Sequence, residues 1–234
     1  MSVAASSIAA NVAAIRVRIE RAAGRGKRPA DGITLVAISK GVPADPIRQA
    51  FLAGVRHFGE SRVQEWESKA PYLEDLDATW HLVGHLQGNK AGRAVALFHT
   101  VDSVDSLPLA ERLDRAAGEG RRLPVLLEVR LDPSGAKSGC APEELPRLAE
   151  GLLLLPHLEW RGLMTVPPLT ENSEQVRAAF RRLRELREEL ARRLDWPLPE
   201  LSMGMSGDFE VAIEEGATQI RVGTAIFGAR AAAA

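Results

Sequence analysis

The feature of this sequence that most constrains its fold is a regular alternation of two hydrophobic patterns. Short, β-branched apolar runs, typical of buried strands, alternate with longer stretches whose apolar residues recur at helical spacing. The first pattern predicts strands at residues 34–40, 55–58, 80–83, 99–102, 124–129, 158–164, 201–203 and 218–222. The second predicts helices at residues 3–24, 45–54, 62–70, 89–97, 107–117, 142–151, 173–194 and 208–215, and residues 223–228 close the last unit.

Eight strands that alternate with helices within 234 residues predict an α/β fold, a single closed (β/α)8 TIM barrel with an extra N-terminal helix. No linker or change of composition marks a second domain. We therefore expect one domain over residues 1–230 and a frayed alanine tail at 231–234. We also expect Asp45 to cap the helix at 45–54, with Pro46 at its first position.

Composition excludes several classes of protein. The formal net charge is −1, which argues against nucleic acid or an anionic membrane as a partner. No apolar run approaches the roughly 20 residues of a membrane span. A single cysteine, Cys140, rules out an internal disulfide and suits the reducing cytoplasm. We expect a cytoplasmic protein that binds neither nucleic acid nor a membrane.

The first strand ends in a lysine, Lys40, followed at once by Gly41 and Pro43. In a barrel of this class the carboxyl ends of the strands form the active face. A partly desolvated lysine there has an accessible neutral amine, which suits a Schiff base. The alternative is that Lys40 only marks where the strand meets water. The other lysines are at 27, 69, 90 and 137, and only Lys137, in a loop on the active face, rivals Lys40.

Two glycine-rich turns follow the last two strands, at residues 202–207 and 223–225. Barrel enzymes often bind phosphate there, because small residues expose backbone N–H groups. A lysine facing a phosphate site suggests pyridoxal 5′-phosphate, with Arg221 as donor to the ring nitrogen. The alternatives are glycines that only permit tight turns and an Arg221 that only forms a structural ion pair.

Other motifs are discounted. His81 and His85 are spaced as on a helix, but they lie at a strand end and in its loop, without a third ligand nearby. No metal site is therefore expected. The chain also lacks a Walker motif and the nucleophile elbow of hydrolases.

Six segments together resemble the pyridoxal phosphate homeostasis protein family, whose barrel is like the N-terminal domain of alanine racemase. They are Leu35-Val36-Ala37-Ile38-Ser39-Lys40, Phe58-Gly59-Glu60, the run 80–90, Arg161-Gly162-Leu163-Met164, Leu201-Ser202-Met203-Gly204-Met205-Ser206 and the run 221–228. They cover nearly the whole chain, in order.

The resemblance implies pyridoxal phosphate held covalently on Lys40, with phosphate contacts from Ser206, Gly223 and Thr224 and with Arg221 near the ring nitrogen. Met203, in the first glycine-rich turn, is a further candidate cofactor-binding residue. Ser61 is another, and it stands where the family usually has Asn. A serine reaches less far, so the affinity or orientation of the cofactor is expected to differ.

The resemblance also implies a role in intracellular pyridoxal phosphate homeostasis, as a carrier or regulator without robust turnover and with no catalytic residue. Two-base racemases need a proton donor facing the lysine, and the only tyrosine, Tyr72, lies on the approach to the third strand. Pyridoxal phosphate-dependent apo-enzymes are candidate recipients, and a monomer is expected. Two alternatives stay open: an amino-acid racemase or lyase that uses Lys40 as the base, and an aldolase-like barrel that uses Lys40 without the cofactor.

Overall fold

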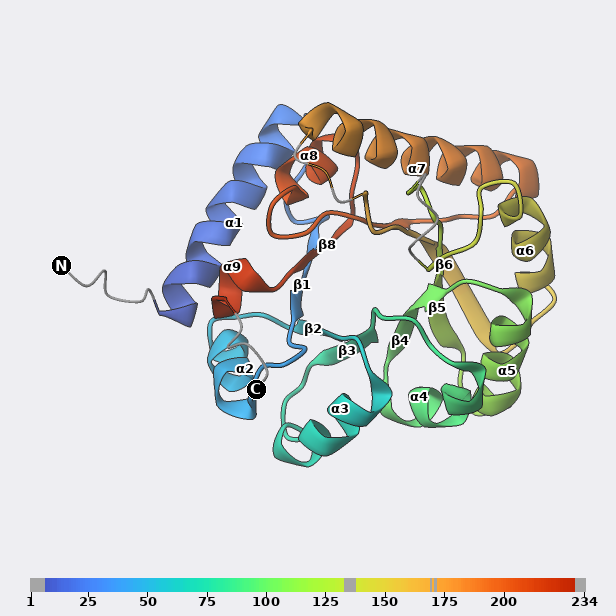
Figure 1. Ribbon diagram of the computed structural model, residues 1–234, viewed down its shortest axis with the longest axis horizontal. Coiled ribbons are helices and arrows are strands. Elements are labelled where there is room, and N and C mark those ends of the chain that lie inside the picture. Colours follow the sequence, from blue (N-terminus) through green and yellow to red (C-terminus); the bar gives the residue numbers. More distant parts are fainter. Residues whose placement is uncertain (1–6, 133–137, 169, 171, 230–234) are drawn as a thin grey trace.

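The computed structural model describes residues 7–132, 138–168, 170 and 172–229, and shows eight parallel strands closed into a barrel (Figure 1). The strands follow one another around the barrel in sequence order, and β1 pairs with β8 to close it. The fold class predicted from the sequence is thus confirmed. The strands are β1 (Thr34–Ile38), β2 (His57–Glu60), β3 (Thr79–Leu82), β4 (Thr100–Val104), β5 (Leu123–Glu128), β6 (Leu158–Met164), β7 (Glu200–Ser202) and β8 (Gln219–Val222).

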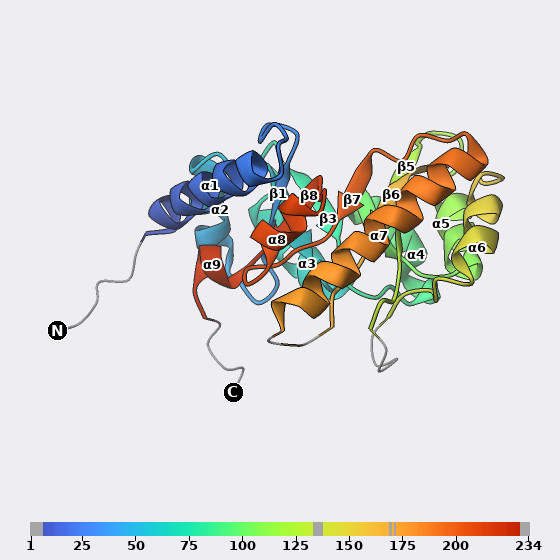
Figure 2. The same ribbon diagram turned by 90° about the horizontal axis from the view of Figure 1, so that it is seen from above.

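Helices surround the strands, and the extra helix α1 packs beside α8, α9 and α2 (Figures 1 and 2). The α-helices are α1 (Ile8–Arg25), α2 (Ala44–Leu52), α3 (Val63–Lys69), α4 (Ala91–Leu97), α5 (Leu107–Ala117), α6 (Leu145–Leu152), α7 (Ser173–Leu194), α8 (Phe209–Glu214) and α9 (Thr224–Phe227). Two 3-10 turns, η1 (Ala70–Tyr72) and η2 (Gly88–Lys90), precede β3 and α4. Among the described residues, no helix combines the length and the apolar character that crossing a membrane requires.

The main hydrophobic core fills the layer between the strands and the helices. Its largest fully buried side chains include Phe58, Phe98, Phe180 and Phe209. Burying this apolar surface is the dominant favourable term in folding. The interior of the barrel, in contrast, holds several buried polar side chains, and these lead toward the candidate site.

Several boundaries differ from the sequence expectations. The second strand covers His57–Glu60 rather than 55–58, and the fourth covers Thr100–Val104 rather than 99–102. The first helix begins at Ile8, after the N-cap Ser7, rather than at residue 3. Apolar runs show that a strand exists, but the pairing of each strand with its neighbours decides its ends.

The predicted cap of the second helix was wrong. Pro43 occupies the N-cap position, α2 begins at Ala44, and Asp45 lies within the first turn. The Asp45 carboxylate is still favourable there, because the N-terminal end of a helix carries partial positive charge. Pro46 is tolerated in the first turn, where its missing N–H would have no helical acceptor. The tail at 231–234 lies outside the described residues.

Candidate functional site

Closure of the barrel brings the first and last strands together, so that segments far apart in the sequence meet at the carboxyl end of β1. Lys40 follows β1, and Gly223 and Thr224 follow its partner strand β8. All three line the same small cavity of about 30 Å³. The pairing of β1 with β8 therefore places the candidate lysine beside the second glycine-rich turn.

The two glycine-rich turns also meet each other. The Ser206 hydroxyl oxygen accepts bonds from the backbone N–H groups of Gly223 at 3.3 Å and Ala225 at 3.4 Å. Gly204 has φ +94°, and a Cβ there would lie 2.6 Å from the Cβ of Ala212. Glycine is thus required for the close approach of this turn to α8. Backbone donors and a hydroxyl converge at one place, which suits a phosphate.

Arg221 is buried in the barrel wall, with 4% of its surface exposed. Its guanidinium donates to the Ser202 hydroxyl and to the backbone carbonyl of Thr165, each at 2.7 Å. These partners are neutral oxygens, so the contacts differ from those of a structural ion pair. Burial lowers the pKa of Arg221, while the negative charge of Asp102 and then of Glu128 opposes that shift.

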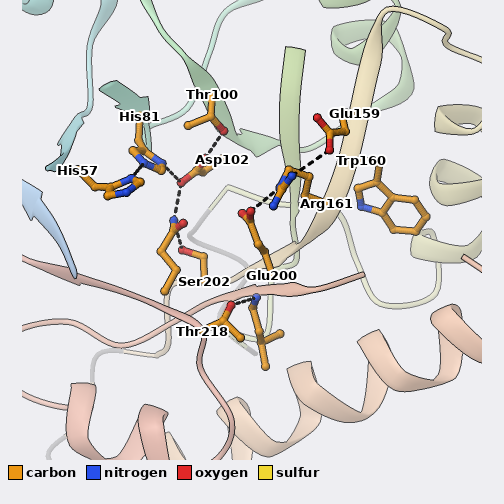
Figure 3. A network of polar contacts seen from close by, with 12 residues as sticks. His57, His81, Thr100, Asp102, Glu159, Trp160, Arg161, Glu200, Ser202 and Thr218 are labelled. Atoms are coloured by element: carbon orange, nitrogen blue, oxygen red, sulfur yellow. Dashed lines mark hydrogen bonds and ion pairs between the residues drawn. The ribbon is translucent and has the colours of Figure 1, made fainter. Parts of the chain in front are cut away.

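A chain of polar side chains runs through the barrel interior, from Ser202 past Asp102 to His81 and His57 (Figure 3). Arg221 contacts this chain at the Ser202 hydroxyl. Gln219 Nε2 donates to Ser202 Oγ at 3.0 Å and to Asp102 Oδ2 at 2.7 Å. The same oxygen, Asp102 Oδ2, also lies 3.0 Å from His81 Nδ1. Burial favours the neutral acid, but the electrostatic interaction with His81 and the hydrogen bonds that Asp102 accepts outweigh it and lower the pKa of Asp102. Asp102 therefore stands as a buried carboxylate at the centre of this chain.

The chain ends at the opposite mouth of the barrel. His57 Nδ1 lies 3.0 Å from His81 Nε2, and both rings line a cavity of about 440 Å³ at the N-terminal ends of the strands. Burial, and then the neighbouring His81, lower the pKa of His57 to about 4. His57 is accordingly neutral near pH 7.

Glu128, the last residue of β5, is a further buried carboxyl group, 3% exposed. The Ser138 hydroxyl donates to its Oε1 at 3.0 Å, while Oε2 has no hydrogen-bond partner among the described residues. Burial raises the pKa of Glu128, and the hydrogen bond from Ser138 opposes the shift. The sequence places Glu128 at the end of a strand, but its burial could not be foreseen.

The remaining predicted site residues are placed differently. Ser61 lies against Gly84, where a Cβ would stand 2.4 Å from the Ser61 carbonyl oxygen. Met203 is fully buried in the hydrophobic core, and its backbone N–H donates to the Gln219 carbonyl at 3.0 Å. Its side chain is thus occupied by packing and its N–H by the neighbouring strand. The rival lysine, Lys137, lies outside the described residues.

The sequence interpretation missed the role of Lys69, which it set aside as a lysine late in a helix. Lys69 Nζ bonds to Glu60, to Glu65 and to the backbone on either side of Lys40. The spacing of Glu65 and Lys69, four residues apart on one helix, was the available signal. His85 lies near Asp105, and no group of side chains able to hold a metal ion is found among the described residues.

Comparison with known proteins agrees with this architecture. The family model for the N-terminal domain of alanine racemase matches residues 6–231. The solved alanine racemase of Clostridium difficile shares the fold with a TM-score of 0.71 at 13% identity, and the match covers 95% of this chain and 56% of that one.

Relatives of higher sequence identity match this chain over almost the whole length of both proteins. The pyridoxal phosphate homeostasis protein of Pseudomonas aeruginosa is 46% identical, with 96% of each chain covered. That of Aquifex aeolicus is 45% identical, with 91% of this chain and 94% of the relative covered. The structure of PipY from Synechococcus elongatus with pyridoxal phosphate bound is 44% identical and has a TM-score of 0.83, covering 95% of this chain and 100% of PipY. This chain belongs to the pyridoxal phosphate homeostasis protein family.

Proposed function

We propose that the chain binds pyridoxal 5′-phosphate as a Schiff base on Lys40 and acts in pyridoxal phosphate homeostasis, as a carrier or regulator without robust turnover. The observation that carries the proposal is the convergence of Lys40, Gly223 and Thr224 on one small cavity at the carboxyl ends of β1 and β8. The cofactor, when bound, would supply an aldehyde, and Lys40 would hold it through Nζ by condensation with loss of water.

The residues present fit this cofactor. The backbone N–H groups of Gly223 and Ala225, which meet at the Ser206 hydroxyl, would hold the phosphate together with Thr224. Arg221 would donate to the ring nitrogen, since an arginine does not give up its proton. An unprotonated ring withdraws electrons weakly, and this favours holding the cofactor over chemistry at its carbon atoms. Ser61 and Met203 remain proposed contacts.

Two features support a role other than catalysis. Tyr72 lies in η1, before β3, so it approaches from the amino end of that strand, away from Lys40. The named relatives are homeostasis proteins, including the Pseudomonas aeruginosa protein. We further propose that the protein is cytoplasmic and monomeric and that apo-enzymes dependent on pyridoxal phosphate receive its cofactor.

The experiment is a visible absorption spectrum with added pyridoxal phosphate, followed by borohydride reduction and peptide mapping. We expect a reducible adduct on Lys40, which the variant Lys40→Ala abolishes while the barrel stays folded. Lys137→Ala serves as the matched control and should retain the adduct. A wild-type protein without the adduct, or a label on Lys137, would reject the proposed site and favour the aldolase-like alternative.

One observation favours the enzymatic alternative, a racemase or lyase. Glu128 is a buried carboxyl group of raised pKa with an oxygen that lacks a hydrogen-bond partner among the described residues, and such groups serve in proton transfer. Exchange of the α-proton of amino acids with deuterated solvent, measured by NMR, would reveal such activity. Exchange lost in both Lys40→Ala and Glu128→Gln would establish the alternative.

A further inference from the structure

The turn that carries Lys40 is bonded to a second lysine. Lys69 Nζ donates to the backbone carbonyl of Ser39 at 2.9 Å and lies 3.4 Å from the carbonyl of Val42. The Lys69 side chain is only 13% exposed. Because Ser39 and Val42 flank Lys40 and Gly41, a single ammonium group lies against the turn on both sides of the candidate cofactor lysine and donates to it at Ser39.

Two carboxylates complete this cluster. Lys69 Nζ donates to Glu60 Oε1 and to Glu65 Oε1, each at 2.8 Å. The same Glu60 oxygen accepts the Ser39 hydroxyl at 2.8 Å. The same Glu65 oxygen accepts the backbone N–H of Gly41. The carboxylates thus tie Lys69 to both Ser39 and Gly41, the two neighbours of Lys40 in the chain.

The arrangement also shows that the amine of Lys69 is fully engaged. An ammonium group has three hydrogens, and Lys69 Nζ has three acceptors at 2.8–2.9 Å: the Ser39 carbonyl and the two carboxylates. Its donors are therefore fully used. Glu60 is completely buried, so moving Lys69 Nζ away would leave the Glu60 carboxylate without its charged partner in the protein interior.

We propose that Lys69 is a positioning residue, which holds the turn Ser39–Val42 so that Lys40 presents its amine to the cofactor. This inference rests on the proposed function, because the role of Lys40 is part of it. Lys69 itself makes no bond to the cofactor. It acts only through the backbone around Lys40, and this separates it from residues that line the cofactor site.

The test is a double-mutant cycle on pyridoxal phosphate affinity with Lys69→Met and Lys40→Ala. In the presence of Lys40, Lys69→Met should weaken binding by about tenfold, as expected for lost bonds to a charged group. In the Lys40→Ala background the same change should alter affinity by less than about twofold, since the residue through which it acts is gone. Lys27→Met, on an exposed lysine before β1, is the control and should bind like the wild type.

Equal weakening in both backgrounds, or none in either, would overturn the proposal. If Lys69→Met fails to fold, Lys69→Met with Glu60→Gln removes the unpaired buried charge and takes its place in the cycle.

A second measurement uses the protein without cofactor. Amide hydrogen exchange of Gly41 and Val42 should become at least about tenfold faster in the Lys69 variant, while exchange in β5 stays unchanged. Unchanged exchange at Gly41 and Val42 would contradict the positioning role. This measurement tests the contact of Lys69 with the turn even if the wild type forms no adduct on Lys40. Absence of the adduct would reject the proposed function, whereas unchanged exchange would reject the role of Lys69.

Discussion

Gln219 and Asp102 are joined across the whole width of the barrel, with Gln219 Nε2 donating to Asp102 Oδ2 at 2.7 Å. Their strands, β8 and β4, are four positions apart in the closed order, so this bond belongs to no sheet ladder. Both side chains are buried. The barrel interior is therefore held by a polar contact between opposite walls, one step from the Ser202 hydroxyl that Arg221 contacts.

Gln219→Leu should lower the free energy of unfolding by about 1–3 kcal/mol, because it leaves buried acceptors on Asp102 and Ser202 with one donor fewer. Denaturant unfolding at pH 7 measures this. Gln64→Leu makes the same chemical change at an exposed position of α3 and should have little effect. Equal stability of the two variants would mean that the contact between the walls contributes nothing.

Ser206→Ala should weaken the binding of pyridoxal phosphate by about tenfold and leave that of pyridoxal, which lacks the phosphate, unchanged. The physical reason is that the Ser206 hydroxyl lies at the meeting point of the Gly223 and Ala225 N–H groups. Fluorescence titration with both compounds checks it. A similar loss for both would place Ser206 away from the phosphate.

The protein should lose stability as the pH falls from about 6.5 to about 4. His57 has its pKa lowered from 6.5 to about 4 by burial and by His81, so in this range the unfolded chain takes up a proton that the folded chain does not. Above pH 6.5 both states are neutral and the contribution is complete. Denaturant unfolding at pH 7, 6 and 5 measures the decline.

His57→Gln is the matched variant and should show a smaller decline over the same range. If its stability fell with pH as steeply as that of the wild type, the loss would have to come from other groups.

Cys140 should react with thiol reagents only after unfolding. Burial, followed by the negative charge of Glu144, raises the pKa of its thiol from 9.0 to about 12, and the side chain is 4% exposed. Because the thiolate is the reactive form, modification at pH 8 should be at least about a hundredfold slower in the native protein than in denaturant. Rapid modification of the native protein would show that the segment around Cys140 opens readily.

The barrel could be predicted because strand and helix periods are local properties of the sequence. Thr34–Ile38 is a short β-branched apolar run typical of a buried strand, and the long helix at 173–194 was predicted with the bounds that the structure has. The cap at Asp45 was wrong, since several residues near a helix start can serve and the preceding turn decides among them. The limits of β2 and β4 depended on strand pairing, which is not local.

The site residues also divide into those that local sequence could predict and those that it could not. Lys40, Arg221 and Gly223 could be selected because each lies at or just after the carboxyl end of a strand. The contacts of Lys69 with Glu60, and of Gln219 with Asp102, join residues whose geometry exists only after the barrel has closed. No local pattern shows that a glutamate such as Glu128 will be buried.

Because β1 pairs with β8, the candidate cofactor site spans the seam where the first and last strands meet. Lys40 lies on one side of this seam and Gly223 on the other. A ligand bonded to both sides would stabilise the pairing of β1 with β8. Release of the ligand and separation of these two strands would then be linked equilibria. During synthesis the candidate site is completed only when the final strand has docked, so binding of a ligand there would require that the whole barrel has folded.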